Sequence, residues 1–189
     1  MLQIIQQVLQ HRLFSYLLLV LAIAPSFPIF RYLIESSMAL HMAGQIPLLI
    51  IAGFFLRHQF IAKQSLFFSL SYWLWIAFAG AFWMLPISLD KALLNPYWDA
   101  FKIVSLLLAG LLLKPALAGS KILALFFIGS SVMMLFFIGY FYQDSPLRLC
   151  NSYLIESQKT AGIGLMLWAA GILLFATIAL SKNLRPEAH

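Results

Sequence analysis

A short apolar segment of the chain carries residue types that bind soft metal ions. Within SSMALHMAGQIPLL (residues 36–49), a histidine stands between two methionines and a glutamine follows one turn later. Met38, His41, Met42 and Gln45 have the spacing i, i+3, i+4 and i+7, which places them on one helix face. Thioether and imidazole together favour Cu(I). The pattern fits a copper site, and it also fits a histidine that hydrogen-bonds a neighbouring helix while the methionines fill gaps in packing.

Two further sulfur side chains are candidate metal ligands. Met84 lies just before Pro86, at the expected end of a helix, where it supplies either a second sulfur ligand or plain packing. Cys150 is the single cysteine, so an intrachain disulfide is excluded. It follows Arg148 by two residues, and a nearby cation lowers the pKa of a thiol and makes it more reactive. Cys150 is therefore a candidate reactive thiol or copper ligand, with an inert thiol as the alternative.

The polar residues near the expected helix ends form a second set of candidates: Glu35, Gln45, Asp99, Lys102 and Gln158. Asp99 and Lys102 are three residues apart at the start of a predicted helix, and Arg31 and Glu35 are four apart. Each spacing predicts an ion pair that stays wet near the membrane interface. Gln158 opens the last predicted helix, and we expect it to hydrogen-bond another helix end near His41.

The composition indicates an integral membrane protein. Of the 189 residues, 63% are hydrophobic and only 10% are charged, and the mean hydropathy is +0.94. Soluble domains are about half apolar and a quarter charged. The net charge of +6 comes from lysines and arginines scattered between apolar runs, so we interpret them as topology signals and expect no nucleic-acid partner.

The apolar runs predict an all-α, six-helix transmembrane bundle. The windows are about 13–30, 33–56, 65–87, 97–113, 122–142 and 161–180, each near the length that spans a bilayer. Residues 1–12 are expected to form an amphipathic interfacial segment, 13–181 the six-span domain and 182–189 a cytoplasmic tail. Seven basic residues fall on the side of the termini and five on the other side. The positive-inside rule then predicts cytoplasmic N- and C-termini in the cell (inner) membrane, with the candidate site at the outer face.

Three ordered segments carry a family resemblance. They are SMALHMAGQIPLLIIAG, FWMLPISLDKALLNPYWDAFKIVSLLLAGLLLKP and SQKTAGIGLMLWAAG. Their order and spacing resemble the CtaG-like assembly factors of caa3-type cytochrome c oxidase. That family has H-M-x-x-H-M in one helix, then W-H-L-P, N-P and E-H, and finally D-Q-x-x-A-G. The resemblance covers roughly residues 31 to 176 and implies an oxidase-maturation or copper-handling protein, with oxidase subunits as partners.

The chain departs from the family pattern at most of its histidines. The replaced positions are Ser37, Met84, Lys102, Ile103 and Ser157, whereas Gln158 remains. His41 matches the second histidine of the first motif; in an alternative alignment it is the first, and Gln45 takes the second position. A chain with these replacements has either lost the copper role or binds the metal through sulfur.

Three hypotheses follow, and none of them is an enzyme. The first is an accessory protein of a respiratory oxidase that handles copper or docks on the oxidase. The second is a haem- or quinone-binding subunit of an electron-transfer complex, in which His41 and Met84 would be the haem ligands. The third is a helical scaffold with a degenerate site. The oligomeric state is left open.

Overall fold

The fold is described from a computed structural model. It describes the backbone of residues 2–56 and 65–184 and the side chains of 13–56 and 65–181; within these ranges the chain forms helices and loops without a strand. The elements are α1 (Leu2–Ile23), η1 (Ala24–Ser26), α2 (Tyr32–Ser36), η2 (Leu40–Gln45), α3 (Ile46–Leu56), α4 (Leu66–Trp83), α5 (Pro86–Leu94), α6 (Pro96–Leu117), α7 (Lys121–Asp144) and α8 (Ile155–Leu184).

Four of the described helices are long and apolar enough to cross a membrane. They are α4, α6, α7 and the Ile155–Ser181 part of α8, and two shorter apolar segments are Leu13–Ser26 and Leu40–Leu56. Large hydrophobic side chains on these helices are exposed, as a lipid-facing surface requires. The apolar helices fit a membrane protein. The six spans, the cytoplasmic termini and the interfacial role of residues 1–12 stay predictions; α1 runs through residue 12 without a break, and the side chains of 182–189 lie outside the described residues.

The second predicted span, 33–56, is interrupted. α2 ends at Ser36, and Ser37 is extended, with φ −143° and ψ 115°. The Ser37 hydroxyl accepts a hydrogen bond from the Leu40 amide, which starts the next helical segment. That segment is α-helical at Met38 and Ala39, continues as the π-helix η2 and becomes the α-helix α3 at Ile46. The carbonyl of Ala43 within η2 accepts a hydrogen bond from the Trp168 indole of α8 at 2.7 Å.

Proline marks the starts of α5 and α6, and a capping side chain precedes the second of them. Pro86 opens α5 and Pro96 opens α6, positions where a missing amide proton costs no helical hydrogen bond. The Asn95 side chain accepts from the Tyr97 amide and so caps α6. The predicted span 65–87 is therefore split into α4 and the short α5, and the predicted span 97–113 continues to Leu117.

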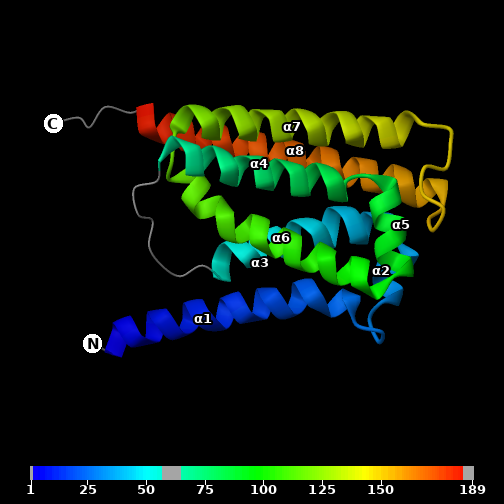
Figure 1. The fold of residues 1–189 in the computed structure, drawn as a ribbon, viewed down its shortest axis with the longest axis horizontal. Helices are drawn as coiled ribbons and strands as arrows, with labels where there is room; N and C mark the ends of the chain where they lie inside the picture. Colours follow the sequence, from blue (N-terminus) through cyan, green and yellow to red (C-terminus); the bar gives the residue numbers. More distant parts are fainter. Residues whose placement is uncertain (1, 57–64, 185–189) are drawn as a thin grey trace.

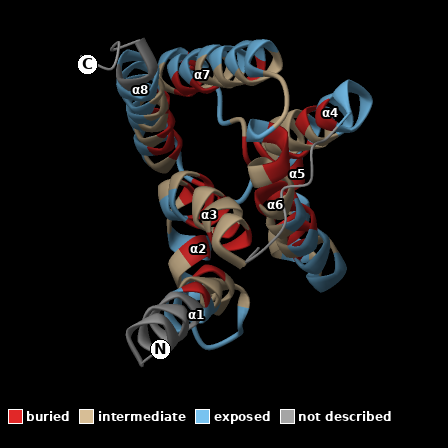
Figure 2. Ribbon diagram, turned by 90° about the vertical axis from the view of Figure 1, so that its left-hand side faces the viewer, coloured by how far each residue is buried: buried red, intermediate tan, exposed pale blue. Residues whose placement is uncertain are grey.

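Close glycine contacts hold the helices in two groups (Figures 1 and 2). α3 crosses α6 where Gly53 meets Gly110, and a Cβ at Gly110 would overlap the carbonyl of Ile50. α4 packs on α6 and α1 packs on α3. The second group is the α7–α8 pair, which meets at Gly139 and Gly162.

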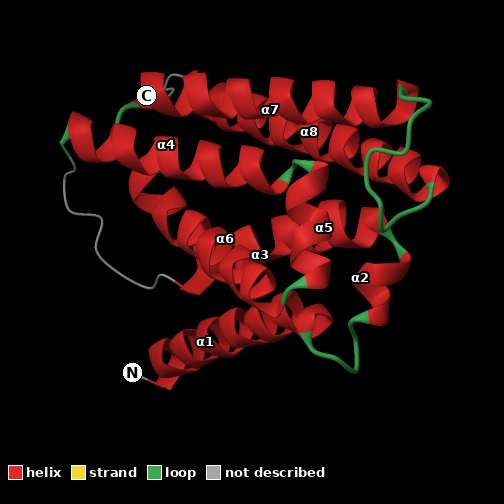
Figure 3. Ribbon diagram, turned by 45° about the vertical axis from the view of Figure 1, so that its right-hand side comes forward, coloured by secondary structure: helices red, strands yellow, loops and turns green. Residues whose placement is uncertain are grey.

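One end of the bundle gathers the short helices and the longest described loop. It comprises α2, α5 and residues 145–154, and we call it the α5 end (Figure 3). α1 begins and α8 ends at the opposite end (Figure 1). The ends of the described chain therefore lie on the same side of the bundle, in line with the predicted shared side of the termini.

Candidate functional site

The ammonium of Lys102 is the centre of a buried polar cluster near the α5 end. Its side chain is fully buried on α6, inside a predicted membrane span. Nζ lies 2.6 Å from Asp99 Oδ1, 2.8 Å from His41 Nε2 and 2.8 Å from Gln45 Oε1. A lysine ammonium has three protons and no acceptor. Two of the three contacts, to His41 and Gln45, are hydrogen bonds, and the third, to Asp99, is an ion pair.

Both ring nitrogens of His41 are engaged. Nδ1 lies 2.8 Å from the hydroxyl of Tyr153, and that hydroxyl donates its proton to the Ile34 carbonyl at 2.6 Å. The hydroxyl must then accept from Nδ1–H, which leaves the lone pair on Nε2 for the Lys102 ammonium. The pattern assigns a neutral His41 protonated on Nδ1. In this arrangement the ring offers no unoccupied lone pair to a metal ion.

The Tyr153 hydroxyl carries its proton at neutral pH, as an unperturbed tyrosine does, and its surroundings favour the protonated form further. Tyr153 lies in the loop before α8, and burial raises the pKa of its phenol well above the usual range; Cys150, Asp90 and Glu35 raise it further. A protonated phenol at neutral pH can donate to Ile34 while it accepts from His41. The loop thus fixes the histidine tautomer from outside the predicted spans.

Gln45 connects the cluster to the first helix. Its Oε1 accepts from Lys102, and its Nε2 donates to the Ser26 hydroxyl at 2.9 Å and to the Ala22 carbonyl at 3.3 Å. Met38, His41 and Met42 are fully buried and Gln45 is 3% exposed. All four residues are buried, and they lie in and beside a π-helix rather than in a regular α-helix.

The Asp99–Lys102 pair forms as predicted, but its predicted location is wrong. The residues are 5% and 0% exposed, so the pair is enclosed by protein instead of wet. Asp99 Oδ1 has no aligned hydrogen bond among the described residues, so its contact with Lys102 is an ion pair. α3, α4 and α5 pack on α6, and the His41 and Gln45 side chains of η2 reach Lys102. The two charges cancel, which is what an apolar environment demands of buried ions.

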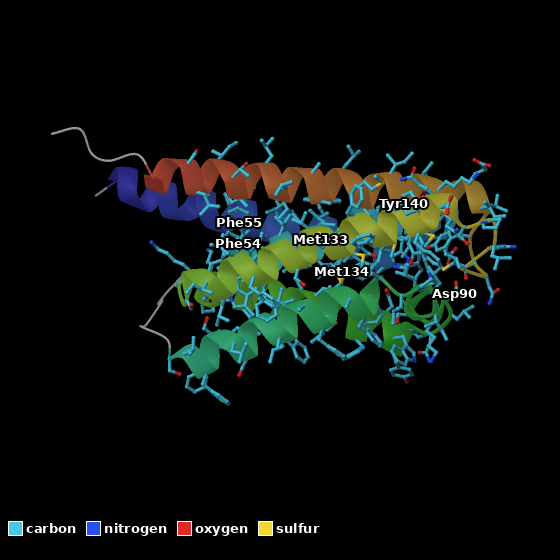
Figure 4. The ribbon with its side chains drawn as sticks, turned by 90° about the horizontal axis from the view of Figure 1, so that it is seen from above. Phe54, Phe55, Asp90, Met133, Met134 and Tyr140 are labelled. Atoms are coloured by element: carbon cyan, nitrogen blue, oxygen red, sulfur yellow. The ribbon has the colours of Figure 1, made fainter. Side chains whose placement is uncertain are left out.

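The loop at residues 145–154 is tied down over the α5 end by its own backbone. Asp90 of α5 accepts from the amides of Asn151 at 2.9 Å and Ser152 at 3.2 Å (Asp90 is labelled in Figure 4). Burial alone would raise the pKa of the Asp90 carboxyl, but these hydrogen bonds and those of the Ser152 and Cys150 side chains hold it below the usual value. Arg148 donates to the carbonyls of Tyr153 and Asn151, both at 2.6 Å.

Gln158 holds the same loop rather than the region of His41. Its Oε1 accepts from the Leu149 amide at 2.9 Å, and its Nε2 donates to the carbonyls of Tyr142 and Leu147 at 3.3 Å. The expected contact to another helix end is found at the end of α7. Its link to the cluster is indirect, through the loop that carries Tyr153.

The Cys150 thiol differs from the sequence expectation. It is 1% exposed and donates to the Pro86 carbonyl at 3.3 Å. Burial, with help from the nearby Asp90 carboxylate, raises the pKa of Cys150 to about 12 and outweighs the opposite effect of Arg148. The prediction of a reactive thiol activated by Arg148 is wrong, because burial and the Asp90 charge disfavour the thiolate more than the guanidinium stabilises it.

Met84 and Glu35 occupy different surroundings. Met84 is 6% exposed, and its carbonyl accepts from the Tyr142 hydroxyl at 2.7 Å. Glu35 is half-exposed and pairs with Arg31 at 3.0 Å, which confirms the predicted i, i+4 pair. Arg31 also donates to the carbonyls of Ala92 and Leu93, so the pair joins α2 to the end of α5.

The predicted sulfur ligands share one buried core with Tyr153. These are Met38, Met42, Met84 and Cys150. Within the described side chains, no group of three or more histidine, cysteine, aspartate or glutamate residues is placed to hold a metal. Neither Tyr153 nor Ser157 was predicted as a site residue. The Ser157 hydroxyl accepts from the Met38 amide at 2.7 Å. The available signal was that both lie in or just after the longest loop, next to polar helix starts.

Comparisons with known proteins found no relative of this chain. No protein-family model, no curated protein and no solved structure matches the chain. The geometry of the chain itself therefore carries the functional argument.

Proposed function

We propose that this protein is a multi-pass membrane accessory protein of a respiratory, cytochrome c oxidase-type complex, and that it docks on oxidase subunits with the α5 end. The observation that carries the proposal is convergence: the three segments that resemble the CtaG-like pattern lie far apart in sequence and meet at this end. A chance resemblance gives no reason for the aligned segments to meet, whether or not each aligned residue is the one that the family has.

The convergence is seen in two direct contacts between these segments and in one link through Tyr142 of α7. His41 of the first segment contacts Lys102 of the second at 2.8 Å, across 61 residues. The Met38 amide donates to the Ser157 hydroxyl of the third segment. Tyr142 links the others, because its hydroxyl donates to Met84 and its carbonyl accepts from Gln158. The positions that differ from the family pattern thus form a connected polar framework of their own.

The state of Lys102 favours docking over copper binding as the primary role. A copper ion at His41 would have to displace an ammonium that already has three partners. Haem ligation by His41 would need the same displacement. Copper handling is the second candidate, because loss of Lys102 from its position would expose an imidazole nitrogen and two oxygens beside the buried Met38 and Met42.

Docking is tested by co-purification from native membranes. Tyr97 stands at the start of α6 near the α5 end with 84% of its surface exposed, and exposed aromatic residues are common interface anchors. We expect oxidase subunits to co-purify with the wild-type protein and to be reduced several-fold by Tyr97→Ala. The matched control is Phe67→Ala, which removes a 74% exposed aromatic ring at the opposite end of α4. Absence of oxidase subunits from the wild-type preparation would refute the docking role.

Copper handling is tested by anaerobic Cu(I) loading of the detergent-purified protein, followed by metal analysis. We expect little copper in the wild type and in His41→Ala, because Lys102 fills the position. Lys102→Ala should gain copper, and the gain should disappear in the double variant with His41→Ala. About one copper per wild-type chain, lost in His41→Ala, would instead establish copper handling as the function.

A further inference from the structure

A cavity separates the two helix groups near the middle of the bundle. It has a volume of about 290 Å³, and α3, α4, α6, α7 and α8 all contribute to its wall. Aromatic rings line it at Trp73 and Phe175, thioethers at Met84 and Met134, and the wall is bare at Gly80. Met134 is labelled on α7 in Figure 4. Figure 2 shows how these five helices are arranged when the bundle is viewed along its long axis.

The wall of the cavity is apolar, and its polar groups are already bonded. The Ser131 hydroxyl donates to the Phe127 carbonyl at 2.8 Å, and the Trp73 indole donates to the Ala116 carbonyl at 3.2 Å. A buried water needs two to four polar partners, which this wall does not supply. An apolar cavity of about half this size is known to bind benzene. The cavity is therefore suited to a hydrocarbon guest.

We propose that this cavity binds one acyl chain of a bilayer lipid. The cavity lies beside the middle of α7 and α8, two predicted spans, where the surrounding medium is hydrocarbon. A quinone head or another polar ring would need hydrogen-bond partners, and Ser131 and Trp73 have theirs inside the protein. A plain chain needs none and gains dispersion contacts with the wall. The proposal is independent of the docking role, because it concerns a different part of the bundle.

Gly80 offers a way to close the cavity without disturbing its wall. A Cβ at Gly80 would meet no atom within 4 Å, so a leucine there can extend into the cavity. Gly129 of α7 also has open space around its Cβ position, but it is exposed and does not line the cavity. The substitutions Gly80→Leu and Gly129→Leu both replace a helical glycine by the same residue. Only the leucine at position 80 would occupy the cavity that the acyl chain is proposed to fill.

The test uses the full chain in lipid nanodiscs that contain a phosphatidylglycerol with a diazirine midway along one acyl chain. After irradiation, we expect wild-type labelling to concentrate between Trp73 and Met84 and between Ile128 and Leu135. Gly80→Leu should reduce this labelling by about tenfold, which corresponds to about 1.4 kcal/mol of lost affinity. Gly129→Leu should label as the wild type does.

Three outcomes would overturn the proposal. One is equal labelling of Gly80→Leu and the wild type; another is labelling spread evenly over lipid-facing residues such as Phe126 and Phe137. The third comes from a second probe, a farnesyl chain bearing a diazirine: preferential labelling by this probe would assign the cavity to an isoprenoid tail. Ser131→Phe fills the cavity from α7 and replaces Gly80→Leu if that variant does not fold; unreduced labelling in Ser131→Phe would then count against an acyl chain.

Discussion

The α3–α6 crossing and the space between α4 and α7 solve the same packing problem in opposite ways. At the crossing, Gly53 of α3 and Gly110 of α6 bring two backbones into contact, and His41 of the adjoining η2 hydrogen-bonds Lys102 of α6. Between α4 and α7, the glycine at position 80 faces open space. A glycine therefore tightens one interface and leaves room at the other. The polar cluster lies beside the tight α3–α6 crossing, and the apolar cavity lies between the two helix groups.

The largest expected effect comes from removing the positive charge of Lys102, which lies beside the α3–α6 crossing. Lys102→Met keeps much of the side-chain volume but leaves the Asp99 carboxylate buried without its cation. Breaking a buried ion pair in this way costs about 3–5 kcal/mol, because an uncompensated charge remains in a medium of low polarity. We expect a loss of that size in the free energy of unfolding, measured by SDS titration in mixed micelles.

The control replaces both charges together. Lys102→Met combined with Asp99→Leu removes the uncompensated carboxylate, so most of the lost stability should return. If the double variant is as unstable as the single one, the ion pair is not the reason for the loss. The hydrogen bonds of Lys102 to His41 and Gln45 would then dominate.

The next effect contrasts two glycines directly. Gly110→Ala forces a methyl group against the Ile50 carbonyl, and overpacking of this kind costs about 1–3 kcal/mol. Gly80→Ala places the same methyl group in open space and reduces the backbone entropy of the unfolded chain, so it should stabilise by up to about 1 kcal/mol. The same SDS titration measures both. If both substitutions changed the free energy of unfolding in the same direction, the distinction between the tightly packed α3–α6 interface and the open space at Gly80 would be contradicted.

The smallest expected effect concerns the loop over the α5 end. The pKa of Asp90 is lowered in the folded protein, so its carboxylate stabilises the fold above the unfolded value of 3.8, and this contribution is lost as the pH falls through the lower folded value. Thermal unfolding in detergent between about pH 6 and pH 3 should show the loss below about pH 4. Asp90→Asn should be less stable than the wild type at neutral pH, and the difference should shrink in acid. A difference that does not change with pH would exclude Asp90 as the titrating group.

Much of the fold was predictable because membrane helices are encoded locally. A run of apolar residues satisfies its own backbone as a helix, so hydropathy alone locates the helices. The predicted windows did not separate α5 from its neighbours, because a proline is compatible both with the end of one helix and with the start of the next. The break at Ser37 was not predicted, since a single serine in an apolar run is common inside membrane helices.

The candidate site was predictable only in part. Helical spacing gave the buried face of His41 and the Asp99–Lys102 pair, because both depend on neighbours within one turn. Contact between these two groups depends on the crossing of α3 and α6, and no local pattern specifies which helices cross. Tyr153 lies 112 residues from His41 and belongs to a loop, so its role required the tertiary structure. The same reason explains the wrong prediction for Cys150, whose sequence neighbour Arg148 matters less than burial.

The π-helix η2 makes the alignment of this site depend on one residue of chain length. Such a segment arises when an extra residue is accommodated within an otherwise regular α-helix. Each residue of an α-helix turns the chain by about 100°. A deletion within residues 40–45 would therefore rotate the preceding segment against α3 and shift it along the axis. His41 and Gln45 would no longer face Lys102 together, and Ala43 would leave the Trp168 indole. Relatives that differ by a single residue here would present a different set of side chains to α6, even with every side chain of the cluster conserved.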